Sequence, residues 1–256
     1  MFDVHCHLEY IENPEKVVEK CKKRDCKICA AVSDLKDVRK VIRFNDGKTV
    51  FVALGLHPER ALKYENLQLD DYEKIIREHA HEIVAVGEIG LDYNWVKDAD
   101  KQERTREIFV RFLRLARELN KPVVIHCREA FSDTLSILEK EYPDGEKVII
   151  HFFTGTKEDL KTCLERGYWI SFNTIACRSK SFRKLIERTP IDKMLLETDA
   201  PWCHPKPDVG KEKELNNVPW NITYTAELIG RLTDRTKEEV LNITEKNAMK
   251  AFGILK

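Results

Sequence analysis

The chain has 256 residues, and its 44 lysines and arginines balance 44 aspartates and glutamates, so the formal net charge is zero. A neutral chain has no overall attraction for nucleic acid or for an anionic membrane, so binding of a polyanion requires a local patch of charge. The length exceeds that of an average domain but suits a barrel of eight strand and helix units, for which about 250 residues are typical.

Eight cysteines are scattered along the chain, and only Cys26 and Cys29 have Cys-x-x-Cys spacing. Together with the lack of a signal peptide, this pattern predicts reduced thiols in a cytoplasmic protein. No apolar run approaches the ~18 residues that a membrane span requires, so we expect no membrane association. The sequence indicates no organic cofactor and does not specify an oligomeric state.

Short apolar runs alternate with charged, helix-like stretches along the chain. The runs are residues 2–7, 28–33, 50–57, 83–90, 123–128, 148–153, 169–173 and 194–200. Amphipathic helices are predicted over 14–24, 34–44, 70–81, 101–119, 132–141, 157–166 and 180–188, and two more, over 221–233 and 236–251, follow the last run. Such apolar strands suit a parallel sheet covered on both faces. The sequence therefore predicts one α/β domain over 1–256, a (β/α)8 TIM barrel with an extra C-terminal helix, and the alternative is a doubly wound open sheet.

The first run contains a His-x-His pattern. In a strand, His5 and His7 would point to one face and Val4 and Cys6 to the other, because successive side chains alternate. Two imidazoles on one face can hold a metal ion, although an isolated pair of this kind often has no chemical role. A metal site therefore requires other residues that converge on this pair.

Polar residues lie at the ends of six of the eight runs. They are His5 and His7, His57, Glu88, His126 and Arg128, His151, and Asp199. Alternation places Val84, Val86 and Glu88 on one face of their run, and it does the same for Val124, His126 and Arg128 and for Leu195, Glu197 and Asp199. Active sites of barrels lie at the carboxyl ends of the strands, so these side chains are expected to meet at one mouth.

Four histidines and two carboxylates at one mouth suit divalent ions such as zinc or manganese, and a carboxylate such as Glu88 can bridge two of them. The simpler alternative is that each histidine is a hydrogen-bonded core residue and that Asp199 caps the turn at Pro201. Six such placements favour the metal site, because buried polar groups without partners are rare.

Several segments, taken in order, match a known family. They are Phe2-Asp-Val-His-Cys-His-Leu, Gly55-Leu-His-Pro, Val86-Gly-Glu-Ile-Gly-Leu-Asp-Tyr, Pro122-Val-Val-Ile-His-Cys-Arg, His151-Phe-Phe-Thr-Gly, Leu196-Glu-Thr-Asp-Ala-Pro-Trp and Asn217-Val-Pro. Over essentially its whole length, the chain resembles the TatD-type metal-dependent hydrolases of the amidohydrolase superfamily.

The resemblance implies a distorted (β/α)8 barrel and a two-metal phosphodiesterase, usually a deoxyribonuclease with exonuclease character. His5, His7 and Asp199 would hold one ion and His126 and His151 the other, with Glu88 as the bridge. The ions would be zinc, manganese or magnesium.

Three positions depart from the family pattern. Glu9 stands where aspartate is expected, and Glu59 stands where a histidine is common. Asn216-Asn217-Val218-Pro219 replaces the usual Arg-Asn-Glu-Pro, which removes a charged pair near the mouth. We expect none of these departures to touch the six ligands.

The remaining roles follow from the chemistry of phosphodiester hydrolysis. Glu88 and Asp199 would be the catalytic carboxylates, with Asp199 as general base. His57, Arg128 and His204 are candidates to bind phosphate oxygens, although Arg128 could instead pair with Glu129 and His204 could be a solvated loop residue. Glu197 is expected to orient a histidine ligand or to serve as a structural acid of the barrel.

Residues outside the metal cluster could contact a nucleic acid strand. The basic segment 178–184 would neutralise a nucleic acid backbone or form a solvated helix face. Trp202 and Tyr93 could stack on bases or pack at the rim. Five arginines of the helix over 101–119 are expected to form i,i+4-type pairs with solvent-side acids instead of contacting DNA, namely Arg104, Arg106, Arg111, Arg114 and Arg117.

The sequence favours a deoxyribonuclease with 3′–5′ exonuclease character that acts on single-stranded DNA or strand ends. A metal-dependent amidohydrolase or esterase of a small molecule is the second hypothesis, because the same metal pair serves many bonds. A metal-binding assembly partner with little catalysis is the third.

Overall fold

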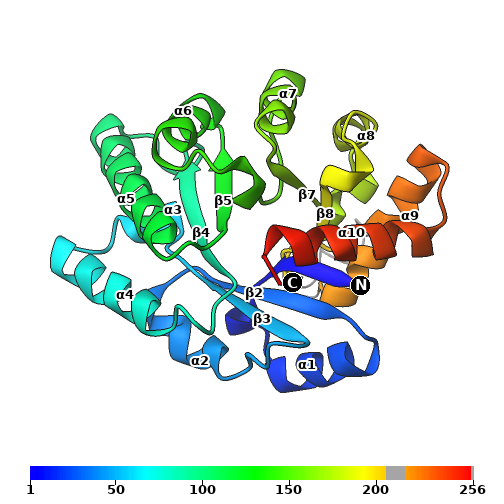
Figure 1. Cartoon of the computed structure of the whole chain (residues 1–256), viewed down its shortest axis with the longest axis horizontal. Helices are drawn as coiled ribbons and strands as arrows, with labels where there is room; N and C mark the ends of the chain where they lie inside the picture. Colours follow the sequence, from blue (N-terminus) through cyan, green and yellow to red (C-terminus); the bar gives the residue numbers. More distant parts are fainter. Residues whose placement is uncertain (206–216, 255–256) are drawn as a thin grey trace.

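The computed structural model describes residues 1–205 and 217–254 and forms a parallel barrel (Figure 1). Each of its eight strands pairs with the next in chain order. The strands are β1 (Phe2–Cys6), β2 (Lys27–Val32), β3 (Val50–Leu54), β4 (Ala85–Asp92), β5 (Val123–Arg128), β6 (Val148–Ile150), β7 (Trp169–Asn173) and β8 (Met194–Glu197).

The residues that follow β8 close the barrel onto β1. Cys6 forms a parallel bridge with Ala200, and the His7 amide donates to the Ala200 carbonyl at 2.7 Å. Consecutive strand order with closure excludes a doubly wound sheet, whose strand order reverses at a switch point. The predicted (β/α)8 barrel is therefore confirmed.

Helices surround the strands, mostly where amphipathic periodicity predicts them. They are α1 (Pro14–Lys23), α2 (Val38–Ile42), α3 (Pro58–Ala61), α4 (Asn66–Glu78), α5 (Ala99–Glu118), α6 (Phe131–Glu141), α7 (Lys157–Glu165), α8 (Lys180–Ile186), α9 (Ile222–Thr233) and α10 (Lys237–Ala251). The short helix α3 was not predicted, and α2 is shorter than predicted because a 3-10 turn over Leu35–Asp37 precedes it. Helix α4 begins before residue 70, where the Gln68 side chain accepts the amide of Glu65 at 3.0 Å. None of the helices within the described ranges could cross a membrane.

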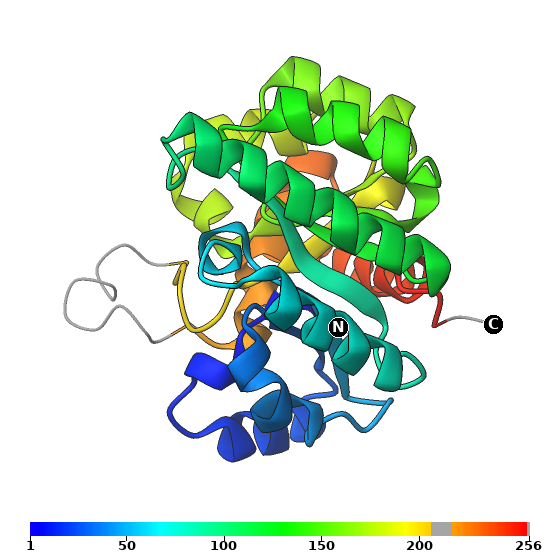
Figure 2. The ribbon, with the colours of Figure 1, turned by 90° about the vertical axis from the view of Figure 1, so that its left-hand side faces the viewer.

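The C-terminal helix α10 covers the end of the barrel where β1 and β8 begin (Figures 1 and 2). Phe252, at its end, lies 5.7 Å from Phe2 between ring centroids, and Phe2 lies 5.4 Å from Phe51. The Asn247 side chain donates to the carbonyls of Ile191 and Met194 at 2.8 and 2.9 Å, which fastens α10 to the start of β8. The extra helix therefore completes the apolar interior of the barrel.

Phe252→Ala should lower the free energy of unfolding by roughly 3–5 kcal/mol, because it leaves a cavity beneath Phe2. Denaturant unfolding followed by circular dichroism measures this change. Leu67→Ala on α4 is the control, since Leu67 is 79% exposed and its removal should alter stability by less than about 0.5 kcal/mol. Equal midpoints for the two variants would contradict a structural role for the C-terminal helix.

Candidate metal centre and active site

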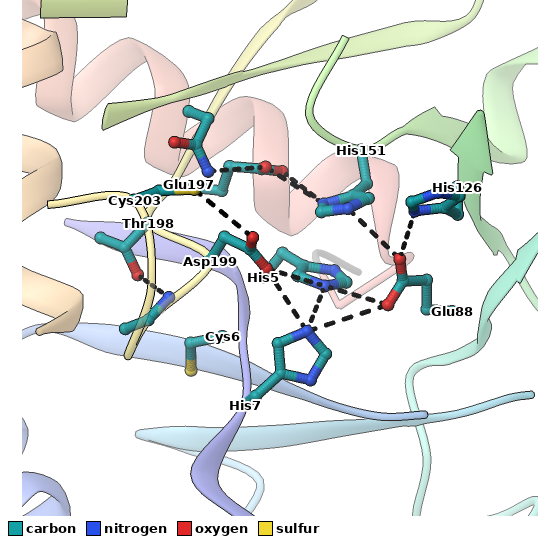
Figure 3. Close-up of polar contacts among 12 residues, drawn as sticks. His5, Cys6, His7, Glu88, His126, His151, Glu197, Thr198, Asp199 and Cys203 are labelled. Carbon is teal, nitrogen blue, oxygen red and sulfur yellow. Dashed lines mark hydrogen bonds and ion pairs between the residues drawn. The ribbon is translucent and has the colours of Figure 1, made fainter. Parts of the chain in front are cut away.

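The six ligands expected from the sequence gather at the carboxyl ends of the strands (Figure 3). Five of them line a cavity of about 670 Å³, and His5 lies fully buried beneath it. The five are His7, Glu88, His126, His151 and Asp199. The barrel thus brings together side chains as distant in sequence as His5 and Asp199.

Register shifts in two strand pairs orient the side chains of His5 and Glu88 toward the cluster. The pairing of β1 with β2 shifts register between Asp3 and Cys6, and the pairing of β4 with β5 shifts between Gly87 and Ile89. Such bulges re-aim side chains and are frequent beside active sites. His5 and His7 do point to the same site.

Strict alternation predicted the wrong face for two residues beside these register shifts, Val4 and Val86. Val4 was expected to share a face with Cys6. Instead, Val4 packs with Phe2 inside the barrel, whereas Cys6 packs in the layer between the strands and the helices. Val86 packs in the layer beneath the helices, although it was expected to share a face with Glu88. A bulge adds one residue to a strand and thereby reverses every assignment on one side of it.

Glu88 occupies the centre of the cluster and is only 3% exposed. Its Oε1 lies 2.8 Å from Nδ1 of His126 and 3.3 Å from Nε2 of His151. Its Oε2 lies 3.5 Å from Nε2 of His5 and 3.8 Å from Nε2 of His7. Each oxygen therefore faces a different pair of histidines.

Asp199 lies two residues beyond β8, in a loop and not on the strand where it was expected. Its φ of 57° is in the left-handed region, which aspartate tolerates better than most residues. The Asp199 amide donates to the His5 carbonyl at 2.9 Å, and Oδ1 lies 3.4 Å from Nε2 of His7. The closure of the barrel thus sets this carboxylate beside the first histidine pair.

Three of the four histidines have a second carboxylate on the side away from the cluster. Nδ1 of His7 lies 3.2 Å from Glu9, Nδ1 of His151 lies 3.1 Å from Glu197, and Nε2 of His126 lies 2.8 Å from Asp92. A carboxylate holds a proton on the nitrogen that it contacts, so the other nitrogen of each neutral ring presents a lone pair to the cluster. Converging lone pairs and carboxylates are the donor set that divalent metals require, so the residues fit such ions.

These contacts confirm one expectation and correct another. Glu197 orients a histidine, as predicted. Glu9, whose departure from the family pattern was expected to touch none of the six ligands, in fact contacts His7.

In the cluster, burial and neighbouring charges shift the pKa values of the ligands in opposite directions. Burial alone would raise the pKa of Glu88, but the neighbouring His151 and His126 hold it well below its ordinary value. Burial alone would lower the pKa of His7, but Glu9 and Asp199 raise it well above the ordinary value. Without metal, the cluster therefore pairs carboxylates with imidazolium groups, and ligands must lose these protons before a cation binds.

His57 lies at the edge of the cluster, just before α3. Its Nδ1 accepts the amide of Glu59 at 3.2 Å, so in the neutral ring the proton resides on Nε2, 3.8 Å from Oε1 of Glu88. Burial, together with His126, lowers the pKa of His57 to about 3, which keeps the ring neutral. This side chain therefore presents an N–H group to the cavity.

The other two residues predicted to bind substrate differ in position. Arg128 is exposed and lines the cavity. His204 is partly buried and is not among the described residues that line it. Only His57 and Arg128 of the predicted set therefore face the site.

Of the two predicted stacking rings, only Trp202 reaches the cavity. Its ring centroid lies 5.2 Å from that of His7. The Tyr93 hydroxyl instead donates to Asp133 and accepts from Arg106 at 2.7 Å, away from the cavity. These hydrogen bonds with two partly exposed side chains turn the Tyr93 hydroxyl toward α5 and α6.

The basic segment 178–184 contributes to the cavity through Phe182 and not through its charges. Arg178, Lys180, Arg183 and Lys184 are not among the described lining residues. On α5, four of the five arginines pair with acidic side chains, but not at the expected i,i+4 spacing. Arg104 and Arg106 pair three residues away on α5 itself, whereas Arg111 pairs with α4 and Arg114 with Glu141 on α6, at 2.9 Å from its Nε. Arg117 donates to the backbone carbonyl of Glu141 at 3.3 Å.

Besides Asp92, which contacts His126, sequence reasoning missed two residues that support the site. Asp3 is fully buried and accepts the amides of His5 and Thr198 at 3.2 and 3.0 Å. Asn217 donates to the Thr198 carbonyl at 3.0 Å and to Thr174 Oγ1 at 3.1 Å. Both side chains hold the segment that leads to Asp199. Their positions inside the first and last matched motifs were the available signal, and the departing Asn216 lies outside the described residues.

A parallel eight-stranded barrel with a buried histidine and carboxylate cluster at its carboxyl end defines a metal-dependent hydrolase. The family model described as TatD related DNase matches residues 2–253. The chain belongs to the TatD family, which confirms the resemblance found in the sequence.

Relatives and solved structures agree with this assignment. The human protein named deoxyribonuclease TATDN3 is 31% identical, with 100% of this chain and 96% of that protein covered. The Bacillus subtilis metal-dependent hydrolase YabD is 32% identical, with 99% of each covered. The crystal structure of YjjV, a TatD homologue from Escherichia coli, matches with a TM-score of 0.86 at 23% identity, covering 99% of this chain and 98% of that one. At that identity, the structural likeness supports the fold alone.

Proposed function

We propose that this hydrolase is a deoxyribonuclease that binds two divalent ions and removes nucleotides from the 3′ end of single-stranded DNA or of exposed strand ends. One observation carries the proposal, namely that the two oxygens of Glu88 face two separate histidine pairs. The name of the human relative supports DNA as substrate.

The residues divide into two ligand sets that share Glu88. His5, His7 and Asp199 would hold one ion, and His126 and His151 would hold the other. Imidazole and carboxylate donors suit zinc or manganese, and magnesium is possible where carboxylates dominate. When bound, such ions lower the pKa of a water molecule and neutralise the charge of the attacked phosphate.

The chain's own residues supply the proton transfer and the grip on phosphate. Asp199 lines the cavity and is held as a carboxylate, because His7 lowers its pKa against the opposing effect of burial. It accepts a proton from the attacking water at Oδ2 or Oδ1. His57 donates its Nε2–H to a phosphate oxygen. Arg128, at the edge of the cavity, donates two hydrogen bonds to the same phosphate in a bidentate contact. Asp3 and Asn217 keep the loop of Asp199 in place.

The experiment uses the full chain, loaded separately with zinc, manganese or magnesium, and single-stranded oligonucleotides labelled at either end. A 3′ label should appear at once as a mononucleotide, whereas a 5′ label should appear as a ladder that shortens stepwise. A phosphorothioate bond at the 3′ end should block both patterns.

Small esters, amides and lactones are assayed in parallel with Asp199→Asn as the background. Turnover of these compounds without cleavage of DNA would replace the proposal with a small-molecule hydrolase. Turnover of neither class above the variant's background would favour a metal-binding assembly partner.

A further inference from the structure

Part of the cavity wall is an aromatic surface formed by Phe152 and Phe182. The two ring centroids lie 6.2 Å apart with an angle of 35° between the ring planes, so the two rings are close neighbours with a moderate tilt. They come from different elements, since Phe152 follows β6 and Phe182 lies on α8. Ile175, from the turn after β7, lines the same cavity.

The backbone places Phe152 in the cavity. Its φ of 42° is in the left-handed region, which a bulky residue rarely adopts. The residue directly follows His151, and the two ring centroids are 6.0 Å apart. Its neighbour Phe153 is 1% exposed and packs in the core, whereas Phe152 is only partly buried. An unfavourable backbone conformation beside a reactive centre points to a function for the side chain that it positions.

Neither phenylalanine can hold a cation ligand set or a phosphate, because neither carries a polar atom. Elsewhere on the cavity wall, Trp202 packs on Tyr10 at 5.0 Å and on His7 at 5.2 Å, so its ring already has aromatic partners. The Phe152–Phe182 surface instead presents partly exposed ring area beside the cluster. An aromatic, apolar surface next to a phosphodiester site matches the face of a nucleobase.

We propose that the Phe152–Phe182 surface binds the base of the nucleotide at the strand end by stacking, so that the site takes base-bearing nucleotides of any sequence in preference to bare sugar phosphates. This inference rests on the proposed nuclease function and specifies its substrate. Stacking is tolerant of sequence because every base has a π face. Phe182 is a specificity-determining residue, and the cleavage chemistry remains with the cluster.

The kinetic test compares Phe182→Ala with Phe182→Trp and the wild type in the metal-loaded chain. The substrates are two single strands that differ only in the 3′-terminal residue, which is a normal nucleotide or a tetrahydrofuran abasic analogue. Phe182→Ala should reduce kcat/KM for the base-bearing strand roughly tenfold, mainly through KM, and should change cleavage of the abasic strand less than twofold. Phe182→Trp should restore the preference.

Phe44→Ala is the matched control, since Phe44 is also a partly buried phenylalanine but does not line the cavity. It should preserve the preference for the base. An equal loss on both strands in Phe182→Ala, or no loss on either, would overturn the proposal.

A binding measurement separates this inference from the nuclease function. Calorimetry with the metal-loaded chain compares thymidine 5′-monophosphate with 2-deoxyribose 5-phosphate. The nucleotide should bind about tenfold more tightly to the wild type and with nearly equal affinity to Phe182→Ala. Should the wild type bind the two compounds equally, the stacking subsite is rejected. Should it show this preference and cut no DNA, the subsite stands and the nuclease function falls.

Discussion

Glu88→Gln is expected to reduce the bound metal from the two ions per chain that we propose to one or none, and to lower hydrolysis by about 10³-fold. The substitution keeps the shape of the side chain but removes the charge at the centre of the cluster. An amide has one acceptor oxygen, so it can serve only one of the two histidine pairs that lie 2.8–3.8 Å from the carboxylate. The loss of roughly 4 kcal/mol of charge stabilisation in the transition state corresponds to about 10³-fold in rate.

Elemental analysis of dialysed protein tests the predicted loss of metal. The rate of hydrolysis at saturating metal tests the predicted loss of activity. Glu129→Gln is the control, because this exposed carboxylate pairs with Lys97 at 3.3 Å outside the cluster. It should retain both metal and activity. Two ions in Glu88→Gln with activity within tenfold of the wild type would remove Glu88 from the centre of the mechanism.

The barrel could be predicted because its signals are repeated and local. Eight apolar runs and the helices between them recur at the spacing of strand and helix units, so an error in one boundary leaves the topology unchanged. The helices predicted over 236–251 and 14–24 begin within one residue of the starts of α10 and α1. The surface against which α10 packs could not be predicted. Its contact with Phe2 forms only once the strands have closed into a barrel.

The convergence of the cluster was predictable for the same reason, since carboxyl ends of parallel strands share one mouth. The orientation of individual side chains was not, because the bulges in β1 and β4 have no signature in alternation. Glu88 reaches the centre only because the register shifts beside it. The contact of Glu9 with His7 also depends on a turn after β1 that sequence periodicity does not describe.

Surface residues were the least predictable. Tyr93 and Trp202 were equivalent rings at strand ends, but a hydrogen bond to Asp133 turns Tyr93 away from the cavity. In segment 178–184 the charges drew attention, whereas Phe182 is the residue that lines the cavity. Such differences arise from contacts between loops that are distant in sequence, and no local pattern encodes them.

Asp199→Asn should lower the rate of hydrolysis by roughly 10²–10⁴-fold, the usual contribution of a general base. Asparagine is the informative substitution because it accepts the left-handed φ of 57° as aspartate does, whereas alanine would strain the loop that closes the barrel. Initial rates at saturating metal, with metal content measured on the same samples, separate loss of the base from loss of a ligand. Asp92→Asn removes the charge beside Nε2 of His126 but keeps an oxygen that can accept the amides of Asn94 and Trp95, and it should cost about 10–100-fold.

Asp199→Gly provides a positive test of the same role. Glycine adopts a positive φ freely and leaves space where the carboxylate stood. Added formate should therefore restore part of the activity in Asp199→Gly and should have no effect on Asp92→Asn, because only the first variant lacks a carboxylate at the proton-accepting position. A general base elsewhere in the cavity would be indicated by more than about a tenth of the wild-type rate in Asp199→Asn, a remainder too large for loss of a group that contributes 10²-fold or more.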